Sequence, residues 1–323
     1  MTYRPICVLG LGLIGGSLVR AVSGAPSGRK VWGATATDST ADQARADGYD
    51  VEPNVDAALQ RANEEDALVV LAVPLPAVPA VLSRVHEVSP TCRLTDVVSV
   101  KRAMRDAVRQ HAPQTRYVGG HPMAGTEESG WAAGSATLFQ GARWVVAADE
   151  GLDLEVWSEV TELAWDCGAL VVPATAEEHD AAVGRVSHLP HLLAAVLAAV
   201  ALDEGPAGVS QGKLALSLAA GSFADGTRVA GTRPELVLAM CQGNREGLLA
   251  AVDDALGRLG AARGSLASTG GLAATVNAGN RARSRWEETR AAEPILIDRD
   301  IELARLRALG RQGAVLAGWR SPS

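Results

Sequence analysis

The segment Ile6–Gly16, ICVLGLGLIGG, decides the fold because it joins a strand pattern to a helix pattern through closely spaced glycines. Its first four residues form an apolar run that predicts a buried strand, and an apolar helical run, Ser17–Val22, follows directly. The turn between them has the pattern Gly-x-Gly-x-x-Gly. In this pattern Gly10 permits a tight turn, Gly12 lets the backbone approach a pyrophosphate, and Gly15 lets the helix pack closely on the strand.

A strand, a glycine turn and a helix in this order predict a dinucleotide-binding site, in which amide groups at the helix start hold the phosphates. The alternative is a glycine turn with a purely structural role. A second strand pattern at 30–34 lies at the right distance to complete a βαβ unit and favours the dinucleotide site. The residues expected to contact the cofactor lie in the turn and at the ends of the next strands: Gly10, Gly12, Leu13, Ile14, Gly15, Thr35, Val73 and Pro74.

The end of the second strand leaves the choice between NAD and NADP open. The acidic residue that binds the ribose hydroxyls of NAD is expected about 20 residues beyond the glycines, and that count reaches Thr35. Within 35–40 the one carboxylate is Asp38, and no arginine stands there to bind a 2′-phosphate. We expect NAD or NADP as the cofactor and favour NAD.

Strand and helix patterns continue to alternate up to about residue 174, which is typical of a doubly wound parallel sheet. Strands are predicted at 67–73, 93–98, 144–147 and 169–172, and helices at 76–85, 101–110 and 154–167. Ligands of such sheets bind beyond the carboxyl ends of the strands. Pro74 and Ser99 follow predicted strands, as the glycine turn does, and the run 116–118 leads into the segment of His121. We therefore expect all of them at one edge of the sheet.

The segment 119–131, GGHPMAGTEESGW, holds one of the six histidines of the chain. Gly119 and Gly120 allow close backbone approach, and Pro122 biases His121 toward an extended conformation. A histidine held in one place is suited to accepting a proton, because imidazole titrates near neutral pH. A lone His-Pro is more often a turn histidine, so its interpretation depends on the rest of the chain.

The pattern changes after Pro173. Residues 176–290 are rich in alanine and leucine, with helical periodicity and no strand pattern. The helix predicted at 186–202 has more apolar surface than one helical layer of a small domain can bury. This excess predicts a homodimer through this region. Two polar motifs stand out, SHLPH at 187–191 and GSFADGTR at 221–228, and we expect the second to be a loop between helices.

Composition excludes several functional classes. The 323 residues are 47% hydrophobic and 21% charged, enough for two cores, and the net charge of −7 indicates no nucleic-acid partner. The apolar run at 191–202 is too short to span a bilayer, and the first residues show no signal-peptide pattern, so we expect no membrane partner and a cytoplasmic protein. The four cysteines are scattered and predict neither a metal site nor a disulfide.

Together the motifs GLGLIGGS, LTDVVSVK, GGHPMAGTEESGW, EEHDAAVGRVSHLPH and GSFADGTRVA resemble, in the same order, those of prephenate dehydrogenases, the enzymes of tyrosine biosynthesis. The resemblance covers about residues 5–250. It implies a Rossmann-type dinucleotide-binding domain at 1–174 and an all-α substrate and dimerisation domain at 175–290, with the active site in the cleft between them. Residues 291–323 remain as a helical tail, too short for an ACT-type regulatory domain, and no chorismate mutase domain is expected before residue 5.

The resemblance also implies an activity, the oxidative decarboxylation of prephenate to 4-hydroxyphenylpyruvate with hydride transfer to NAD(P)+. His121 would accept the hydrogen bond and proton of the ring hydroxyl, and Ser99 would orient that hydroxyl or the imidazole.

Substrate-binding roles also follow from the resemblance, and they fall on the helical domain and on the segment after His121. Arg228 would bind a substrate carboxylate, and His191, with His188 beside it in SHLPH, would line the substrate pocket. Glu127 would belong to an ionic network that gates the cleft.

Two departures from the family pattern leave the substrate open. Ala224 stands where the family often has a basic residue, and the tryptophan common a few residues after the Arg228 motif is absent from 234–238. Arogenate dehydrogenase, or 4-amino-4-deoxyprephenate dehydrogenase in secondary metabolism, is therefore the alternative on the same scaffold.

Other functional classes fit less well. A 3-hydroxyacid dehydrogenase would need a catalytic lysine on the helical domain, where Lys213 is the only lysine after residue 101 and has no site pattern around it. A non-catalytic dinucleotide sensor would have no use for His121, Ser99, His191 and Arg228 together.

Overall fold

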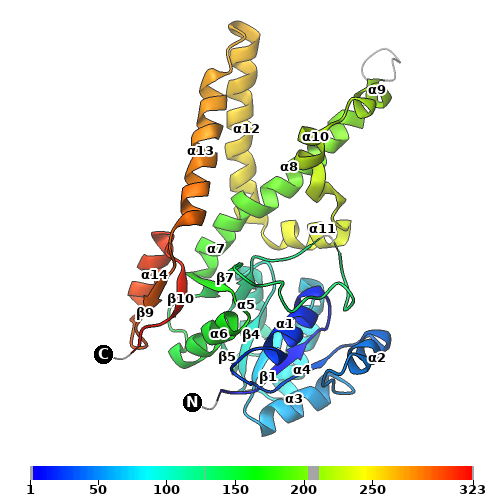
Figure 1. Ribbon diagram of the computed structural model, residues 1–323, viewed down its shortest axis with the longest axis vertical. Helices are drawn as coiled ribbons and strands as arrows, with labels where there is room; N and C mark the ends of the chain where they lie inside the picture. Colours follow the sequence, from blue (N-terminus) through cyan, green and yellow to red (C-terminus); the bar gives the residue numbers. More distant parts are fainter. Residues whose placement is uncertain (1–2, 127, 203–210, 322–323) are drawn as a thin grey trace. The chain divides into compact units, whose positions relative to one another are not determined.

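A computed structural model describes residues 3–126, 128–202 and 211–321 of the chain (Figure 1). Two compact units emerge from it. The first comprises Met1–His179 together with Ala273–Ser323, and the second comprises Asp180–Leu272. The first unit thus ends five residues later than the expected domain boundary at 174, and it takes up the end of the chain as well.

The first unit is built on a parallel five-stranded sheet in the order β2-β1-β3-β4-β5. Its strands are β1 (Ile6–Leu9), β2 (Val31–Ala34), β3 (Leu68–Leu71), β4 (Arg93–Asp96) and β5 (Arg116–Tyr117). Its helices are α1 (Leu13–Ser23), α2 (Asp38–Ala46), α3 (Val55–Glu64), α4 (Val78–Val88) and α5 (Arg102–His111). The predicted fold class, a doubly wound α/β sheet followed by a helical region, is confirmed.

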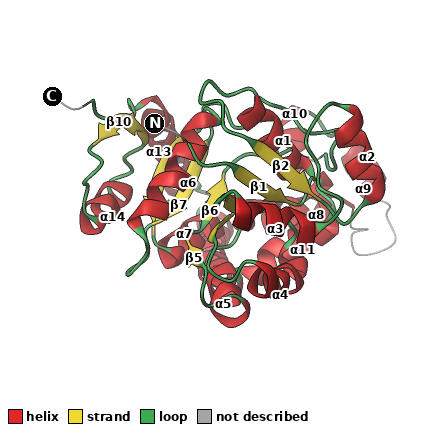
Figure 2. Ribbon diagram, turned by 90° about the horizontal axis from the view of Figure 1, so that it is seen from below, coloured by secondary structure: helices red, strands yellow, loops and turns green. Residues whose placement is uncertain are grey.

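Both faces of this sheet are buried, as a run of apolar residues without polar alternation requires. In β1, Ile6 and Val8 join one hydrophobic core, whereas Cys7 and Leu9 join the other. The first core includes side chains of α1 and the second includes side chains of α3. Figure 2 accordingly shows β1 and β2 between these two helices.

A second sheet of five strands, which the sequence did not predict, has the order β6-β7-β8-β10-β9. Its strands are β6 (Gly120–Pro122), β7 (Arg143–Ala147), β8 (Leu170–Ala174), β9 (Ile295–Ile297) and β10 (Leu316–Trp319), and α6 (Leu154–Asp166) connects β7 to β8. β7 pairs with β8 in parallel but with β6 antiparallel, so that His121 lies opposite Val145. The strands predicted at 144–147 and 169–172 therefore exist, but they belong to this mixed sheet.

The structure corrects the expectation of a helical tail at 291–323. The helix α14 (Leu303–Arg311) lies between β9 and β10, and β10 pairs with β8. Leu306 and Leu316 are fully buried in the same core as Val171. Gly310 packs so closely that a Cβ there would lie 1.8 Å from the carbonyl oxygen of Pro173, which explains a glycine within this helix. The tail is thus an integral part of the first unit.

Among its described residues the second unit contains helices and the turns that connect them, and no strand, as predicted. The helices of this part of the chain are α7 (Ala176–Val183), α8 (Leu189–Leu202), α9 (Gln211–Ser217), α10 (Gly221–Thr227), α11 (Pro234–Gly243) and α12 (Arg245–Ser268), and α13 (Ala273–Ala291) follows in the first unit. The segment 221–228, expected to be a loop, instead forms α10 and the start of a 3₁₀ turn at Arg228–Gly231.

The helices α7 and α8 are joined by a π-helical turn, Gly184–His188, into one continuous helix. Among the described residues this helix, Ala176–Leu202, is the one that is long and apolar enough to cross a membrane, by length and composition alone. The apolar run expected at 191–202 is therefore only its second half. The first half carries polar side chains that are buried in the protein, among them His179, Asp180 and His188.

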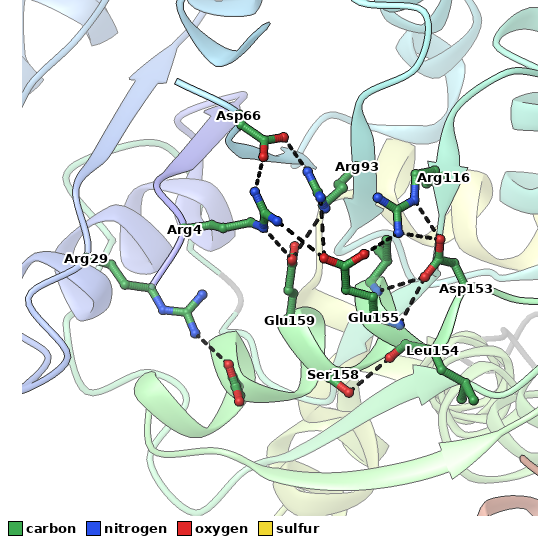
Figure 3. Close-up of polar contacts among 12 residues, drawn as sticks. Arg4, Arg29, Asp66, Arg93, Arg116, Asp153, Leu154, Glu155, Ser158 and Glu159 are labelled. Carbon is green, nitrogen blue, oxygen red and sulfur yellow. Dashed lines mark hydrogen bonds and ion pairs between the residues drawn. The ribbon is translucent and has the colours of Figure 1, made fainter. Parts of the chain in front are cut away.

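An ionic network holds α6 to the amino-terminal edge of the first sheet. Figure 3 shows its members, Arg4, Asp66, Arg93, Arg116, Asp153, Glu155 and Glu159. Arg4 Nε donates to Glu159 Oε1 over 2.7 Å, and Arg116 lies within 2.6 Å of Asp153 and Glu155. The hydrogen bonds from Arg116 lower the pKa of both of these carboxyl groups. Because the arginines precede or begin strands, this network lies at the edge opposite the strand carboxyl ends.

Candidate functional site

The glycine turn is shaped so tightly that two of its positions accept only glycine. Gly10 has φ +105°, and a Cβ there would lie 2.4 Å from the carbonyl oxygen of Ala72. A Cβ on Gly15 would lie 1.9 Å from the carbonyl oxygen of Gly10. The turn is anchored to β2 by the amide of Gly10, which donates to Ala34 O over 2.8 Å. These contacts press α1 against the carboxyl ends of β1 and β3.

Gly12 differs from these glycines, because the space that its Cβ would enter is open to 4 Å. It is the N-cap of α1 and brings no side chain to cap the helix. The first amides of a helix have no acceptor within the helix. In α1 these amides begin at Leu13 and Ile14, beside the open space at Gly12. The first turn of α1 contains no acidic residue that would repel an anion. Such an arrangement fits a pyrophosphate.

The other residues expected to contact the cofactor lie at the same edge of the sheet. Thr35 follows β2, and Val73 and Pro74 follow β3, so that all three adjoin the ends of the strands on either side of β1. Asp38 is exposed in the first turn of α2, three residues beyond Thr35. The structure thus brings together the whole set of residues predicted for the cofactor.

A buried carboxylate, Asp96 at the end of β4, organises the neighbouring part of the site. Its Oδ1 accepts hydrogen bonds from the amide of Val98 (2.8 Å) and from Lys101, and its Oδ2 accepts one from the hydroxyl of Tyr117 (2.6 Å). Lys101 also donates to the carbonyl oxygen of Gly120 over 2.5 Å. The side chains of Asp96 and Lys101 are at most 1% exposed. Burial and the charge of Asp96 raise the pKa of Tyr117 well above its usual range.

This cluster explains the glycine pair before the histidine. A Cβ on Gly119 would lie 2.8 Å from the hydroxyl of Tyr117, and one on Gly120 would lie 2.6 Å from the carbonyl oxygen of Asp96. Larger residues would therefore displace the chain from the buried charges. The close approach fixes the position of Gly120 at the start of β6 and so that of His121, the next residue.

His121 lies in β6 with 8% of its surface exposed, and its Nδ1 is 2.7 Å from Nε2 of His179 on α7. Ser99 is half-buried in the bend that follows β4, between the partners Val98 and Lys101 of Asp96. His121 and Ser99 thus both sit on segments that Asp96 holds. Sequence reasoning did not single out His179, although the motif EEHD that contains it belongs to the family resemblance.

The remaining predicted residues lie in the second unit, with one exception. His188 is fully buried, and its Nδ1 lies 3.1 Å from Nδ2 of Asn244, which also donates to the carbonyl oxygen of Asp180. His191 is half-exposed and its Nδ1 donates to the carbonyl oxygen of Ser187 over 2.8 Å. Glu127 lies outside the described residues.

Arg228 begins the 3₁₀ turn after α10 and is exposed. It forms no ion pair with any residue that the structure describes. Its forked donors are thus available for an external carboxylate.

Comparison with known protein families matches two domain models to consecutive parts of the chain. The nucleotide-binding domain of prephenate dehydrogenase matches residues 21–173, and the dimerization domain of prephenate dehydrogenase matches residues 175–269. The chain belongs to the prephenate dehydrogenase family.

Relatives in this family include a prephenate dehydrogenase of Bacillus subtilis, 29% identical over 252 residues that cover 77% of this chain and 66% of that protein. A cyclohexadienyl dehydrogenase of Zymomonas mobilis is 30% identical over 273 residues, which cover 83% of this chain and 90% of that protein. The chain thus spans just under two thirds of the Bacillus protein and most of the Zymomonas protein.

Solved structures in the family are similar as well. A candidate prephenate dehydrogenase of Corynebacterium glutamicum has 43% identity and a TM-score of 0.90, over 99% of this chain and 100% of that one. An arogenate dehydrogenase of Synechocystis has 28% identity and a TM-score of 0.74, over 88% of this chain and 100% of that one.

A prediction about stability follows from the buried ion pair of Asp96 and Lys101. The isosteric change Asp96→Asn removes the carboxylate that pairs with the buried Lys101 ammonium, and we expect it to lower the free energy of unfolding by about 3–5 kcal/mol. The double variant Asp96→Asn, Lys101→Met removes both charges of the pair and should recover a large part of that loss. Urea unfolding followed by circular dichroism measures both. A single variant as stable as the parent would show that Asp96 does not have this role.

Proposed function

We propose that this protein is an NAD(P)-dependent dehydrogenase that oxidatively decarboxylates prephenate to 4-hydroxyphenylpyruvate. The observation that carries the proposal is a buried histidine, His121, held by a charge network in the same unit as a glycine turn that fits a pyrophosphate. Membership of the prephenate dehydrogenase family supports the assignment.

The chemistry explains what this chain has to supply. Prephenate has a hydrogen and a hydroxyl on C4 and a carboxylate on C1 of a cyclohexadiene ring. The nicotinamide, when bound, accepts the C4 hydride. The bond from C1 to the carboxylate provides the electron pair that completes the aromatic ring as CO2 leaves, so no net proton is released. What remains for the protein is to hold the ring in place and to stabilise the hydroxyl as positive charge develops on it.

His121 has the properties for the second task. A neutral imidazole accepts a hydrogen bond from the C4 hydroxyl, takes the proton while the oxygen carries positive charge, and returns it to the phenol oxygen of the product. We assign Ser99, on the bend after β4, to orienting the same hydroxyl or the imidazole. Both residues lie on segments tied to Asp96, so their placement does not depend on a flexible loop.

Substrate carboxylates need cationic partners, and we assign Arg228 to this role because its guanidinium is exposed and its forked donors match a carboxylate. His191 would contribute Nε2, since its Nδ1 is bound to Ser187. For His188 we propose a packing role in place of substrate contact, because its buried ring is hydrogen-bonded to Asn244.

Arogenate is the second candidate substrate, on the same scaffold and by the same chemistry. It carries an amino group where prephenate carries a keto group. Ala224 in α10 brings no positive charge near Arg228, so nothing at this position repels an ammonium group. 4-Amino-4-deoxyprephenate, which carries its amino group on the ring, is a further candidate on this scaffold.

We also propose that the second unit forms a homodimer. Large apolar side chains of α8 and α12 are exposed on a single chain, including Val196, Val200, Leu256 and Leu259. Burying such side chains against a second copy removes apolar surface from water. The match to the family's dimerization domain covers both helices.

The proposed activity is tested by mixing the purified protein with prephenate or arogenate and with NAD or NADP. Reduction of the nicotinamide, followed by its absorbance, is expected with at least one of the four pairs. The ratio of kcat/KM for the two substrates then identifies the preferred one. Absence of reduction with all four pairs would overturn the dehydrogenase assignment.

Two variants separate proton acceptance from carboxylate binding. His121→Asn keeps a polar side chain but removes the proton acceptor, and we expect kcat to fall about 10²–10⁴-fold. Arg228→Ala should chiefly raise KM, because it removes a contact made by substrate and transition state alike. Steady-state kinetics give both parameters. The exposed Arg233→Ala, nearby in the chain, is the matched control for Arg228.

For the cofactor we propose that NAD is preferred, because the Asp38 carboxylate at the start of α2 disfavours a 2′-phosphate. Asp38→Asn should then raise kcat/KM for NADP relative to NAD by about 10-fold, which corresponds to about 1.4 kcal/mol. Asp42→Asn, one turn further along α2, is the control and should leave the ratio unchanged. An unchanged ratio in Asp38→Asn would show that another residue sets the preference.

A further inference from the structure

A second histidine lies within hydrogen-bond distance of the proposed proton acceptor. Nδ1 of His121 lies 2.7 Å from Nε2 of His179, and their rings meet edge to face at 71°. This distance leaves no room for a water molecule between the two nitrogens, and both residues are buried, His179 at 2% and His121 at 8% exposed. At this distance one nitrogen carries a hydrogen and the other accepts it.

The position of His179 is fixed by the start of α7. Thr175 and Glu178 form a reciprocal capping box, in which each side chain accepts from the backbone amide of the other at 3.2 Å or less. The amide of Ala176 donates to Asp149 over 2.9 Å. The amide of His179 donates in turn to Thr175 O, so the imidazole stands one turn into a firmly capped helix.

The direction of the hydrogen bond between the two histidines decides whether His121 can work as proposed. A neutral imidazole has one N–H and one bare nitrogen. If His179 donates, Nδ1 of His121 is the acceptor, and Nε2 of His121 then carries the hydrogen and cannot accept a proton. If His121 donates from Nδ1, its Nε2 is the bare nitrogen. Only the second arrangement leaves a proton acceptor.

We propose that His179 is a positioning residue that accepts the Nδ1–H of His121 and thereby keeps Nε2 of His121 as the proton acceptor. This inference rests on the proposed function for its catalytic consequence. The bond strengthens when Nε2 of His121 takes the proton, because a charged donor forms a stronger hydrogen bond than a neutral one. His179 thus favours the state in which the substrate hydroxyl has given up its proton.

Nitrogen NMR of histidine tests the direction of the bond without any turnover. The chain has six histidines, so a protein labelled with ¹⁵N in its histidines gives few ring signals, and His121→Asn identifies those of His121 by their loss. We expect Nδ1 of His121 to be protonated and Nε2 to be bare in the parent protein. A protonated Nε2 with a bare Nδ1 would overturn the proposal, whether or not the protein turns over prephenate.

Kinetics of His179 variants test the consequence for the rate. His179→Leu removes the acceptor, and we expect kcat to fall about 10–100-fold with little change in KM, as for other residues that orient a reactive imidazole. His179→Gln places a carbonyl oxygen near the position of Nε2 and should restore most of kcat. The exposed His86→Leu on α4 is the matched control and should be unchanged.

Equal rates for His179→Gln and His179→Leu, or a parental rate in His179→Leu, would contradict the positioning role. Thermal unfolding of each variant shows whether a loss of rate reflects a loss of folding, and rescue by glutamine separates the two causes. If the parent protein reduces no cofactor with either substrate, the proposed function fails. The NMR result still decides how the two histidines are bonded.

Discussion

A single buried negative charge determines how the first unit is put together. Asp96 ends a strand with no access to water, and a carboxylate in that position is stable only when charges and hydrogen-bond donors surround it. It obtains them from Lys101, Tyr117 and two backbone amides, those of Val98 and Gly120. Because β4 belongs to one sheet and Gly120 to the other, satisfying this charge also joins the two sheets.

The same requirement connects fold and chemistry. Residues that donate hydrogen bonds to Asp96 stand next in sequence to the residues that we assign to the reaction. Ser99 stands between Val98 and Lys101, and His121 directly follows Gly120. The glycines of the turn differ in the same way, because packing requires Gly10 and Gly15, whereas Gly12 borders the open space that we assign to the cofactor phosphates. Some glycines of these sequence motifs are therefore required by packing, because a larger side chain would not fit at their positions.

The sequence predicted those parts of the fold in which a residue pattern is compatible with a single local structure. Strands β1 to β4 of the parallel sheet and the glycine turn were predicted because nearly continuous apolar runs and the fixed glycine spacing leave little choice. The strands β9 and β10 were missed because their few residues carry a weak pattern, and they form only through pairings distant in sequence, of β10 with β8 and of β9 with β10. The helix α10 was expected to be a loop because glycine and aspartate are poor helix formers. His179 was missed because a histidine after two glutamates looks solvent-exposed, and only tertiary packing buries it.

The return of the chain to its first unit has a consequence for how the protein forms. The helical unit is inserted between β8 and β9, and the edge of β8 that pairs with β10 stays unpaired until roughly 140 further residues have been synthesised. An unpaired strand edge is a template for association with other chains. During translation, the first sheet can complete its five strands early, whereas the second sheet waits for the last residues described. The second sheet is thus complete only when its last strand, β10, has been synthesised.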